Sequence, residues 1–140
     1  RIVDLFAGTG SLGIEGLSRG AIWADFVEHS PRQCAVIQSN LESTGLSYKG
    51  QVHSMDVRQA LGVLEGPFTV ALMDPPYKLK TLDPVLNDLA SSGLVAVDGV
   101  VVVGHSKYLE LKKDYSGLSK TRSRRYGDSV VDFFTPRKSW

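Results

Sequence analysis

Short apolar runs of strand length alternate with amphipathic segments along most of the chain. The apolar runs predict strands, and the segments whose apolar residues recur at helical spacing predict helices. A run of four valines at residues 100–103 has the β-branched content of a buried parallel strand. Strands are predicted at residues 2–6, 24–28, 51–56, 68–73 and 100–103, and helices at residues 14–19, 31–45, 57–64 and 84–94. This alternation predicts an α/β fold with a doubly wound, mostly parallel sheet.

The last quarter of the chain has a different pattern. Residues 118–126 and 129–135 predict two strands joined at Gly127 and Asp128, which is a β-hairpin signal. A terminal antiparallel hairpin on an otherwise parallel sheet distinguishes a methyltransferase from most dehydrogenases. The 140 residues contain no repeat, low-complexity segment or linker, so we expect a single domain at residues 1–140.

Charge is distributed unevenly, although the net charge is only +1. Residues 1–104 hold 7 basic and 11 acidic side chains, whereas residues 105–140 hold 9 basic and 4 acidic ones. A basic C-terminal quarter favours contact with a polyanion. The candidate phosphate contacts in the first hairpin strand are Lys120, Arg122, Arg124 and Arg125. A solvated edge strand protected by its charge remains the alternative.

Several classes of protein are disfavoured by composition. No apolar run approaches the roughly 20 residues that span a bilayer, so no membrane contact is expected. Cys34 is the single cysteine, which excludes an internal disulfide framework and fits a reducing cytoplasm. We interpret it as a buried helix residue. The three histidines are scattered and provide no metal-ligand spacing, so no metal is expected.

A glycine-rich segment connects the first predicted strand to the first predicted helix. Gly8, Gly10 and Gly13 allow a tight turn and close approach of the backbone to a ligand. The strand-to-helix context favours a nucleotide-like ligand over a merely close-packed turn. Asp4, at the end of the strand, is either a structural acid or a partner for a charged amine of that ligand.

Two further acids follow predicted strands. Glu28 lies 20 residues after Gly8, where a carboxylate can accept hydrogen bonds from two adjacent ribose hydroxyls. Asp56 is either an acceptor for an adenine amino group or the N-cap of the helix after it. These acids suit a ligand with an adenosine and no pyrophosphate, such as S-adenosylmethionine, whose chemistry needs positioning rather than a metal.

The apolar run at residues 68–73 stops abruptly at Asp74, Pro75, Pro76 and Tyr77. Proline lacks an amide hydrogen and fixes φ, so the sheet ladder is expected to end at Asp74. The Asp74 carboxylate and the Pro75 carbonyl can accept hydrogen bonds from a planar amine, and Tyr77 can stack on its base. A base inside a duplex cannot reach such a rim, so the predicted target is unpaired or flipped out.

These segments together carry a resemblance that covers nearly the whole chain. The chain resembles the bacterial ribosomal RNA guanine-N2 methyltransferase family that acts on the small subunit. The Asp-Pro-Pro-Tyr motif is shared by several amino-methyltransferases, whereas Leu-Ser-Arg-Gly-Ala and Arg-Tyr-Gly-Asp narrow the resemblance. The matching segments are residues 4–10, 13–15, 17–21, 26–28, 73–77, 105–106 and 125–128.

The resemblance implies a Rossmann-like class I methyltransferase with seven strands, the last one antiparallel. It implies methyl transfer from S-adenosylmethionine to the N2 amine of a guanine in small-subunit ribosomal RNA, free or in a ribonucleoprotein particle, by a cytoplasmic protein that we expect to be a monomer. The implied cofactor residues are Asp4, Phe6, Gly8, Gly10, Glu28 and Asp56, and the implied catalytic residues are Asp74, Pro75, Pro76 and Tyr77.

The chain departs from the family in two respects. Gly104 stands where members often carry Glu, and the family's N-terminal segment is absent. The chain begins at Arg1 rather than Met, so we expect it to be the trimmed core of a longer protein.

Three other functions are considered. An adenine-N6 methyltransferase shares the motif but usually adds a target-recognition region. An NAD-dependent dehydrogenase would use the glycine turn and Glu28 but gives no reason for residues 74–77. A non-catalytic RNA-binding module would retain the cofactor-binding fold without the activity.

Overall fold

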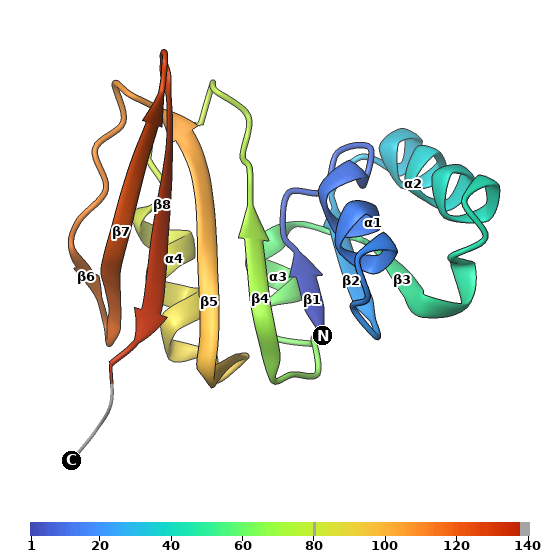
Figure 1. Cartoon of the computed structure of the whole chain (residues 1–140), viewed down its shortest axis with the longest axis horizontal. Helices are drawn as coiled ribbons and strands as arrows, with labels where there is room; N and C mark the ends of the chain where they lie inside the picture. The colour runs from blue at the N-terminus through green and yellow to red at the C-terminus, as the bar shows by residue number, and fades with distance from the viewer. Residues whose placement is uncertain (80, 138–140) are drawn as a thin grey trace.

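The computed structural model describes residues 1–79 and 81–137, which form one eight-stranded sheet flanked by helices (Figure 1). The strand order is β3-β2-β1-β4-β5-β8-β7-β6. Strands β3, β2, β1, β4 and β5 are parallel, and the pairs β5–β8, β8–β7 and β7–β6 are antiparallel. The strands are β1 (Ile2–Asp4), β2 (Ala24–Glu28), β3 (Gly50–Ser54), β4 (Phe68–Met73), β5 (Val95–Ser106), β6 (Asp114–Tyr115), β7 (Leu118–Tyr126) and β8 (Ser129–Pro136).

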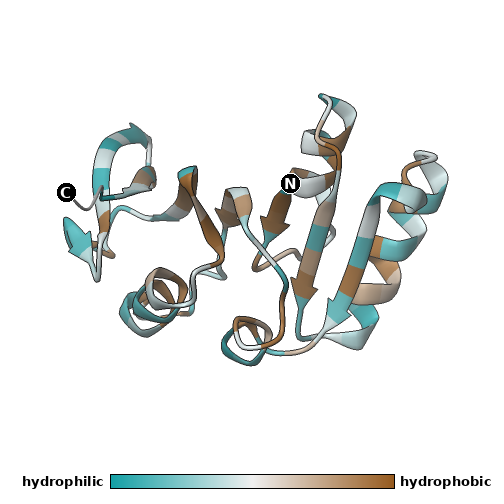
Figure 2. Ribbon diagram, turned by 90° about the horizontal axis from the view of Figure 1, so that it is seen from below, coloured by the Kyte–Doolittle hydropathy of each residue, from teal (hydrophilic) through white to brown (hydrophobic). Residues whose placement is uncertain are grey.

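Helices lie on both faces of the sheet, as Figure 2 shows from below. The helices are α1 (Ser11–Ser18), α2 (Pro31–Ser43), the 3-10 helix η1 (Ser47–Lys49), α3 (Val57–Ala60) and α4 (Asp83–Ser91). Helix α2 begins where the sequence predicts, because Ser30 Oγ accepts from the Gln33 amide and Pro31 occupies the first turn. None of the helices in the described part of the chain is long and apolar enough to cross a membrane.

Two hydrophobic clusters fill the space between the helices and the sheet. The cluster beneath α1 and α2 contains Ile14, Leu17, Phe26, Ile37 and Leu41. The larger cluster on the opposite face, beneath α3 and α4, includes Phe68, Met73, Leu86, Val101 and Phe134. Alternate residues of β4 face opposite layers, because Ala71 and Met73 belong to the larger cluster whereas Val70 and Leu72 pack against the smaller one.

The predicted fold class is confirmed, with a parallel sheet and a C-terminal antiparallel hairpin, but the expected count of seven strands is one too low. The extra strand, β6, has two residues, so it is too short to produce an alternating pattern. Strand β5 is longer than the predicted 100–103. Its first part includes residues between Val95 and Val100 that pair irregularly with β4. The glycine-containing, partly polar segment there concealed the start of the strand.

The topology brings several chain segments to one edge of the sheet. Strand β8 is antiparallel to both β5 and β7, so β7 runs in the same direction as β1 to β5. The β7–β8 turn at Gly127 therefore lies at the edge where β1, β4 and β5 end. The strand order reverses between β1 and β4, and ligands of open α/β sheets bind outside the carboxyl ends of strands at such a point.

Candidate active site

The glycine turn between β1 and α1 is formed as the sequence predicts. Gly8 and Gly10 have φ of 58° and 80°, a left-handed conformation that side chains other than glycine rarely adopt. Gly10 is also the N-cap of α1. A Cβ at Gly13 would collide with the ring of Phe26, so this glycine allows the helix to approach β2.

Asn40, to which the sequence assigned no role, fixes this turn from α2. Its Nδ2 donates to the Thr9 carbonyl oxygen at 2.9 Å, between the two left-handed glycines. A single polar residue on an amphipathic helix carries no signal of such a contact, because the contact depends on how α2 packs beside α1. The turn is therefore held from outside as well as by its own backbone.

Asp4 ends β1 beneath the glycine turn and is 1% exposed. Its Oδ2 accepts from the Gly13 amide at 3.2 Å, whereas its Oδ1 is buried without a hydrogen-bond partner among the described residues. Burial raises the pKa of Asp4 to about 7; the Gly13 hydrogen bond opposes this rise, and the nearby charges of Asp74 and Glu28 add to it. The charges of Glu28 on β2 and of Asp74 after β4 therefore act on the Asp4 carboxylate at the end of β1.

Glu28 ends β2 and is also buried. Its Oε1 accepts from the Gly8 amide at 3.1 Å and its Oε2 from the Ser30 amide at 2.9 Å. Oε2 also lies 3.3 Å from Nδ1 of the exposed His29 ring, so Glu28 can accept from one hydroxyl at Oε1 and from a neighbouring one at Oε2 when that ring turns away. Cys34, interpreted as a buried residue, is half-buried, and its Sγ donates to the Glu28 carbonyl oxygen at 3.3 Å.

A pocket of about 180 Å³ opens beside Glu28. Phe6 and Val57 provide apolar walls, and Asp56 lies at the same pocket. Of the two roles considered for Asp56, the structure shows the N-cap, because its Oδ1 accepts from the Arg58 amide at 2.8 Å. The side chain is exposed, so its second oxygen can also accept from a ligand.

A second pocket, of about 290 Å³, lies at the rim formed by residues 74–77. Asp74, Tyr77 and Gly104 line it together with apolar residues of β4, β5 and β8. Leu79, a few residues further along the same loop, lines the first pocket. The loop after β4 therefore separates two pockets, one beside the glycine turn and one beside the rim.

The rim itself has the predicted shape. Strand β4 ends at Met73, Pro75 is buried, and Asp74, Pro76 and Tyr77 are exposed. The Leu79 amide donates to the Pro76 carbonyl at 3.0 Å and closes the turn that follows. Partial burial raises the pKa of Asp74 above its ordinary value, which makes this carboxylate a better proton acceptor. Tyr77 Oη lies 2.8 Å from Ser129 Oγ, a contact that connects the rim to the first residue of β8.

Gly104 leaves open space directly beside Asp74. A Cβ at this position would lie 3.1 Å from Asp74 Oδ1, a distance that real Cβ atoms seldom show. The absence of a side chain at residue 104 therefore keeps the second pocket open next to the carboxylate.

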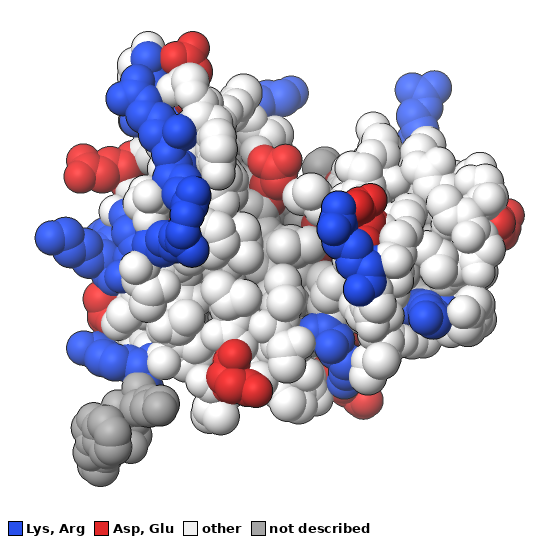
Figure 3. All heavy atoms as spheres, in the orientation of Figure 1, with Lys and Arg blue, Asp and Glu red and all other residues white. Residues whose placement is uncertain are grey.

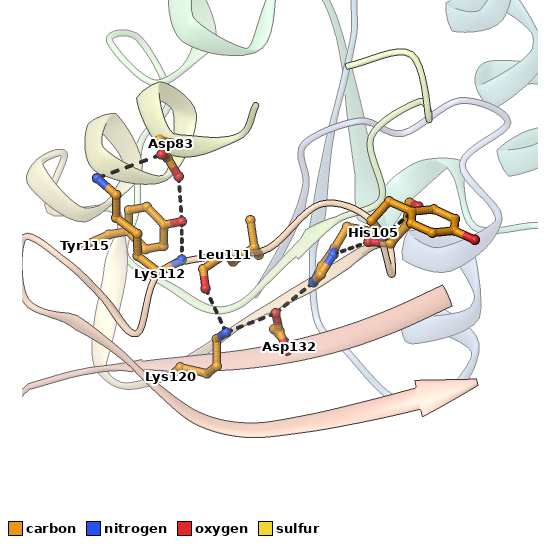
Figure 4. A network of polar contacts seen from close by, with 9 residues as sticks. Asp83, His105, Leu111, Lys112, Tyr115, Lys120 and Asp132 are labelled. Carbon is orange, nitrogen blue, oxygen red and sulfur yellow. Dashed lines mark hydrogen bonds and ion pairs between the residues drawn. The ribbon is translucent and has the colours of Figure 1, made fainter. Parts of the chain in front are cut away.

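A buried polar network anchors the C-terminal hairpin below the rim (Figure 4). His105 Nε2 on β5 lies 2.7 Å from Asp132 Oδ2 on β8, and Lys120 Nζ on β7 lies 3.4 Å from the same oxygen. Burial acts to raise the pKa of Asp132, but the hydrogen bonds of Ser123 and His105 and the charge of Lys120 outweigh it and hold the pKa below its ordinary value. Lys120 also donates to the Leu111 carbonyl at 3.1 Å.

The structure separates the four basic residues predicted to contact RNA. The ammonium of Lys120 is engaged inside the protein, whereas Arg122, Arg124 and Arg125 are exposed. Arg122 and Arg124, which lie opposite Phe133 and Val131 of β8, share one face of β7 because they are two residues apart, whereas an irregularity after Lys120 places that side chain on the other face. Basic side chains follow β7 along this face in Figure 3, beside a surface with few charges.

No group of three or more metal-ligating side chains occurs within residues 1–79 and 81–137.

A parallel sheet with this strand order, a glycine turn after β1 and an antiparallel strand between β5 and β7 is the fold of class I methyltransferases. Within this class, the chain belongs to the family described as Conserved hypothetical protein 95, whose model matches residues 1–135. It is an RsmD-like member of that family.

Relatives of the chain are found in several bacteria. The Bacillus subtilis (strain 168) protein "Putative rRNA methyltransferase YlbH" is 34% identical over 140 residues, which cover 98% of this chain and 76% of that protein. "Ribosomal RNA small subunit methyltransferase D" of Escherichia coli (strain K12) is 29% identical over 101 residues, covering 72% of this chain and 50% of that protein. The chain therefore aligns with about half of the Escherichia coli protein.

A solved structure has nearly the same fold. A Streptococcus pyogenes chain described as a conserved hypothetical protein superposes with a TM-score of 0.90 at 32% identity, covering 99% of this chain and 86% of that one.

The buried carboxylate of Asp4 generates a prediction about stability. The pKa of Asp4 in the folded chain, about 7, exceeds the ordinary value near 4, so burying the ionised form is unfavourable. This cost is absent below pH 4, develops between pH 4 and 7 and is complete above pH 7. Asp4→Asn is therefore expected to stabilise the ligand-free chain increasingly over that range, by at most about 4 kcal/mol.

Denaturant unfolding at several pH values measures this difference. Glu42→Gln, at an exposed acid on α2, serves as the control and should change the stability only slightly. A difference between Asp4→Asn and the unchanged chain that stayed constant from pH 4 to 8 would show that Asp4 does not titrate there.

Proposed function

We propose that this chain is the catalytic domain of an S-adenosylmethionine-dependent methyltransferase that modifies a guanine N2 amine of small-subunit ribosomal RNA. The observation that carries the proposal is the pair of pockets on either side of the loop after β4. One adjoins the glycine turn and Glu28, and the other contains Asp74 and Tyr77. A donor and an acceptor can thus be held at one edge of the sheet.

The first pocket and the glycine turn fit the donor. Glu28 would accept from the two ribose hydroxyls, Phe6 and Val57 would contact the adenine, and the second oxygen of Asp56 would accept from its amino group. Gly8 and Gly10 allow the backbone to approach the ligand. The unpaired Oδ1 of Asp4 supports contact with the ligand's ammonium group, directly or through one water molecule. S-adenosylmethionine supplies an electrophilic methyl group when bound.

The rim fits the acceptor. The lone pair of an exocyclic amine is delocalised into the base, so the amine must become pyramidal to attack. Hydrogen bonds to Asp74 and the Pro75 carbonyl would favour this geometry and stabilise the developing positive charge. Asp74 would accept the proton that the amine loses on methylation, and would release it to solvent afterwards. Pro75 and Pro76 keep the rim stiff, and Tyr77 stacks on the base.

The names of the relatives support ribosomal RNA as the polymer. The choice of guanine N2 is supported by the resemblance of the motifs, as is action in the cytoplasm on RNA or on a small-subunit particle. An adenine-N6 methyltransferase is the second candidate, because Asp-Pro-Pro-Tyr suits either amine. Monomeric action by a single domain stays a prediction.

Cofactor binding is the first test. We expect calorimetry to show binding of S-adenosylmethionine and little binding of NAD. Glu28→Gln should weaken the former about 10- to 150-fold, because hydrogen bonds to a charged group are lost, whereas Glu42→Gln should not. An analogue without ribose hydroxyls should bind the unchanged chain weakly and lose little more in Glu28→Gln. Preferential binding of NAD would contradict the proposal and favour a dehydrogenase.

Methyl transfer is the second test. Asp74→Ala should lower turnover by about 10²–10⁴-fold, because an acceptor for the amine is lost, and leave cofactor affinity within several-fold. The measurement is incorporation of labelled methyl groups into small-subunit RNA and particles from cells lacking the modification, followed by identification of the nucleoside. N6-methyladenine as product would replace the guanine assignment. Unchanged turnover in Asp74→Ala would remove Asp74 from the mechanism.

RNA contact along β7 is the third test. Arg122→Gln combined with Arg124→Gln should weaken RNA binding and make log K less dependent on log salt by about 1.4 to 1.8 units of slope, because two phosphate contacts are lost. The matched control is Arg19→Gln with Lys49→Gln, which removes the same charge near α1 and η1. Equal slopes in both variants would favour the solvated edge strand, and a separate Arg125→Gln variant tests the other face of β7.

A further inference from the structure

Three tyrosines at the carboxyl edge of the sheet are exposed more than folding requires. Tyr77 in the rim, Tyr108 after β5 and Tyr126 at the end of β7 are 73%, 83% and 61% exposed. Aromatic side chains ordinarily contribute to stability by burial, so an exposed group of them indicates a binding surface. Only Tyr77 has a role in the function proposed above.

The three tyrosines are connected through two serines. Ser129 lies opposite Tyr126 on one side and opposite Ser106 of β5 on the other. The Tyr77 hydroxyl lies 2.8 Å from Ser129 Oγ, and the Tyr108 amide donates to Ser106 Oγ at 3.2 Å. Directly opposite residues of antiparallel strands have Cβ atoms about 5 Å apart, so these side chains originate from one small area.

The turn after β5 also adjoins the rim directly. Ser106 and Leu109 line a small cavity together with Pro75, Pro76 and Tyr77. The Lys107 amide donates to the Asp128 carbonyl at 2.9 Å, and Lys107 Nζ lies 2.8 Å from Asp128 Oδ1. The turn is therefore fixed between the rim and the tip of the hairpin.

Basic residues accompany these rings, and one of them, Lys107, is paired with Asp128. Lys107 Nζ lies 5.0 Å from the centroid of the Tyr108 ring, Arg124 and Arg125 precede Tyr126, and Lys78 follows Tyr77. Proteins that bind single-stranded nucleic acid combine aromatic faces, on which bases stack, with basic side chains that follow the phosphates. The arrangement of the tyrosines has both components.

We propose that Tyr108 and Tyr126 form, with Tyr77, a stacking platform for unpaired RNA nucleotides that flank the target base. This inference rests on the proposed function for the identity of the target. Removing a base from its stack costs free energy, and stacking of its neighbours on the protein offsets part of that cost. Duplex RNA keeps its base faces stacked internally and is recognised by its shape and phosphates, so it cannot use such a platform.

Binding of a short labelled RNA without secondary structure, compared with the same strand annealed to its complement, tests the platform. Tyr108→Ala and Tyr126→Ala should each weaken binding of the unpaired strand about 5- to 100-fold and leave duplex binding unchanged. The corresponding Phe variants should bind like the unchanged chain, because stacking needs the ring and not the hydroxyl.

Tyr48→Ala is the matched control. Tyr48 is 72% exposed and has a neighbouring lysine, Lys49, at 5.5 Å from its ring centroid, but it lies on η1. This variant should bind both RNAs normally. The platform would be overturned if Tyr48→Ala bound unpaired RNA as weakly as the other two Ala variants, if duplex binding fell equally, or if the Phe variants bound weakly. Normal binding of unpaired RNA by both Tyr108→Ala and Tyr126→Ala would also overturn it and would indicate a protein partner for these tyrosines.

Methyl transfer measured in parallel separates the two proposals. If RNA is methylated while Tyr108→Ala and Tyr126→Ala bind normally, the platform is wrong and the enzyme assignment stands. If the tyrosines govern binding of unpaired RNA but no RNA is methylated, the platform stands and the proposed function is wrong.

Discussion

The parallel pairing of β1 with β4 places Asp4 opposite Leu72, and the chain leaves the sheet from both strands within two residues of that pair. One exit leads into the glycine turn and the other into the rim. A slip of one residue in this pairing would exchange the two faces of a strand, so the glycine turn and the rim would no longer leave the sheet side by side. The adjacency of the two candidate pockets therefore depends on the same backbone hydrogen bonds that hold the centre of the sheet.

Two buried aspartates differ in the neighbours that surround their carboxylates and therefore in their pKa values. Asp132 lies against His105 and Lys120, and these partners lower its pKa below the ordinary value. Asp4 has one amide donor and two acidic neighbours, and its pKa is raised to about 7. The first carboxylate stabilises the hairpin, whereas the second lacks compensation within the protein. A buried acid of the second kind is characteristic of a site that a cation completes.

The sequence predicted those parts of the site that depend on local chain geometry. Gly8 and Gly10 permit the positive φ that the turn needs, and the two prolines fix φ at their own positions, so the glycine turn and the rim could be placed before any packing was known. The contact from Asn40 to Thr9 and the burial of Lys120 depend on elements distant in sequence. The alternating basic pattern of β7 suggested four exposed cations, but the irregularity after Lys120 shifted the register and directed that side chain toward Asp132. Strand β6 was not predicted, because two residues are too few to show the alternation of apolar and polar positions.

The hairpin connects the surface proposed for RNA to the proposed chemistry. Strand β8 contacts the rim through Ser129 and Tyr77, and its inward side is fixed to β5 through Asp132 and His105. Gly104 lies immediately before His105, and its missing side chain leaves the space beside Asp74 open. A larger residue there would compete with an incoming amine for the oxygen nearest to it. Under the proposed function, Asp74 would therefore be the carboxylate that accepts a hydrogen bond from the amine and can receive its proton, and Gly104 on β5 would keep the space beside its Oδ1 open.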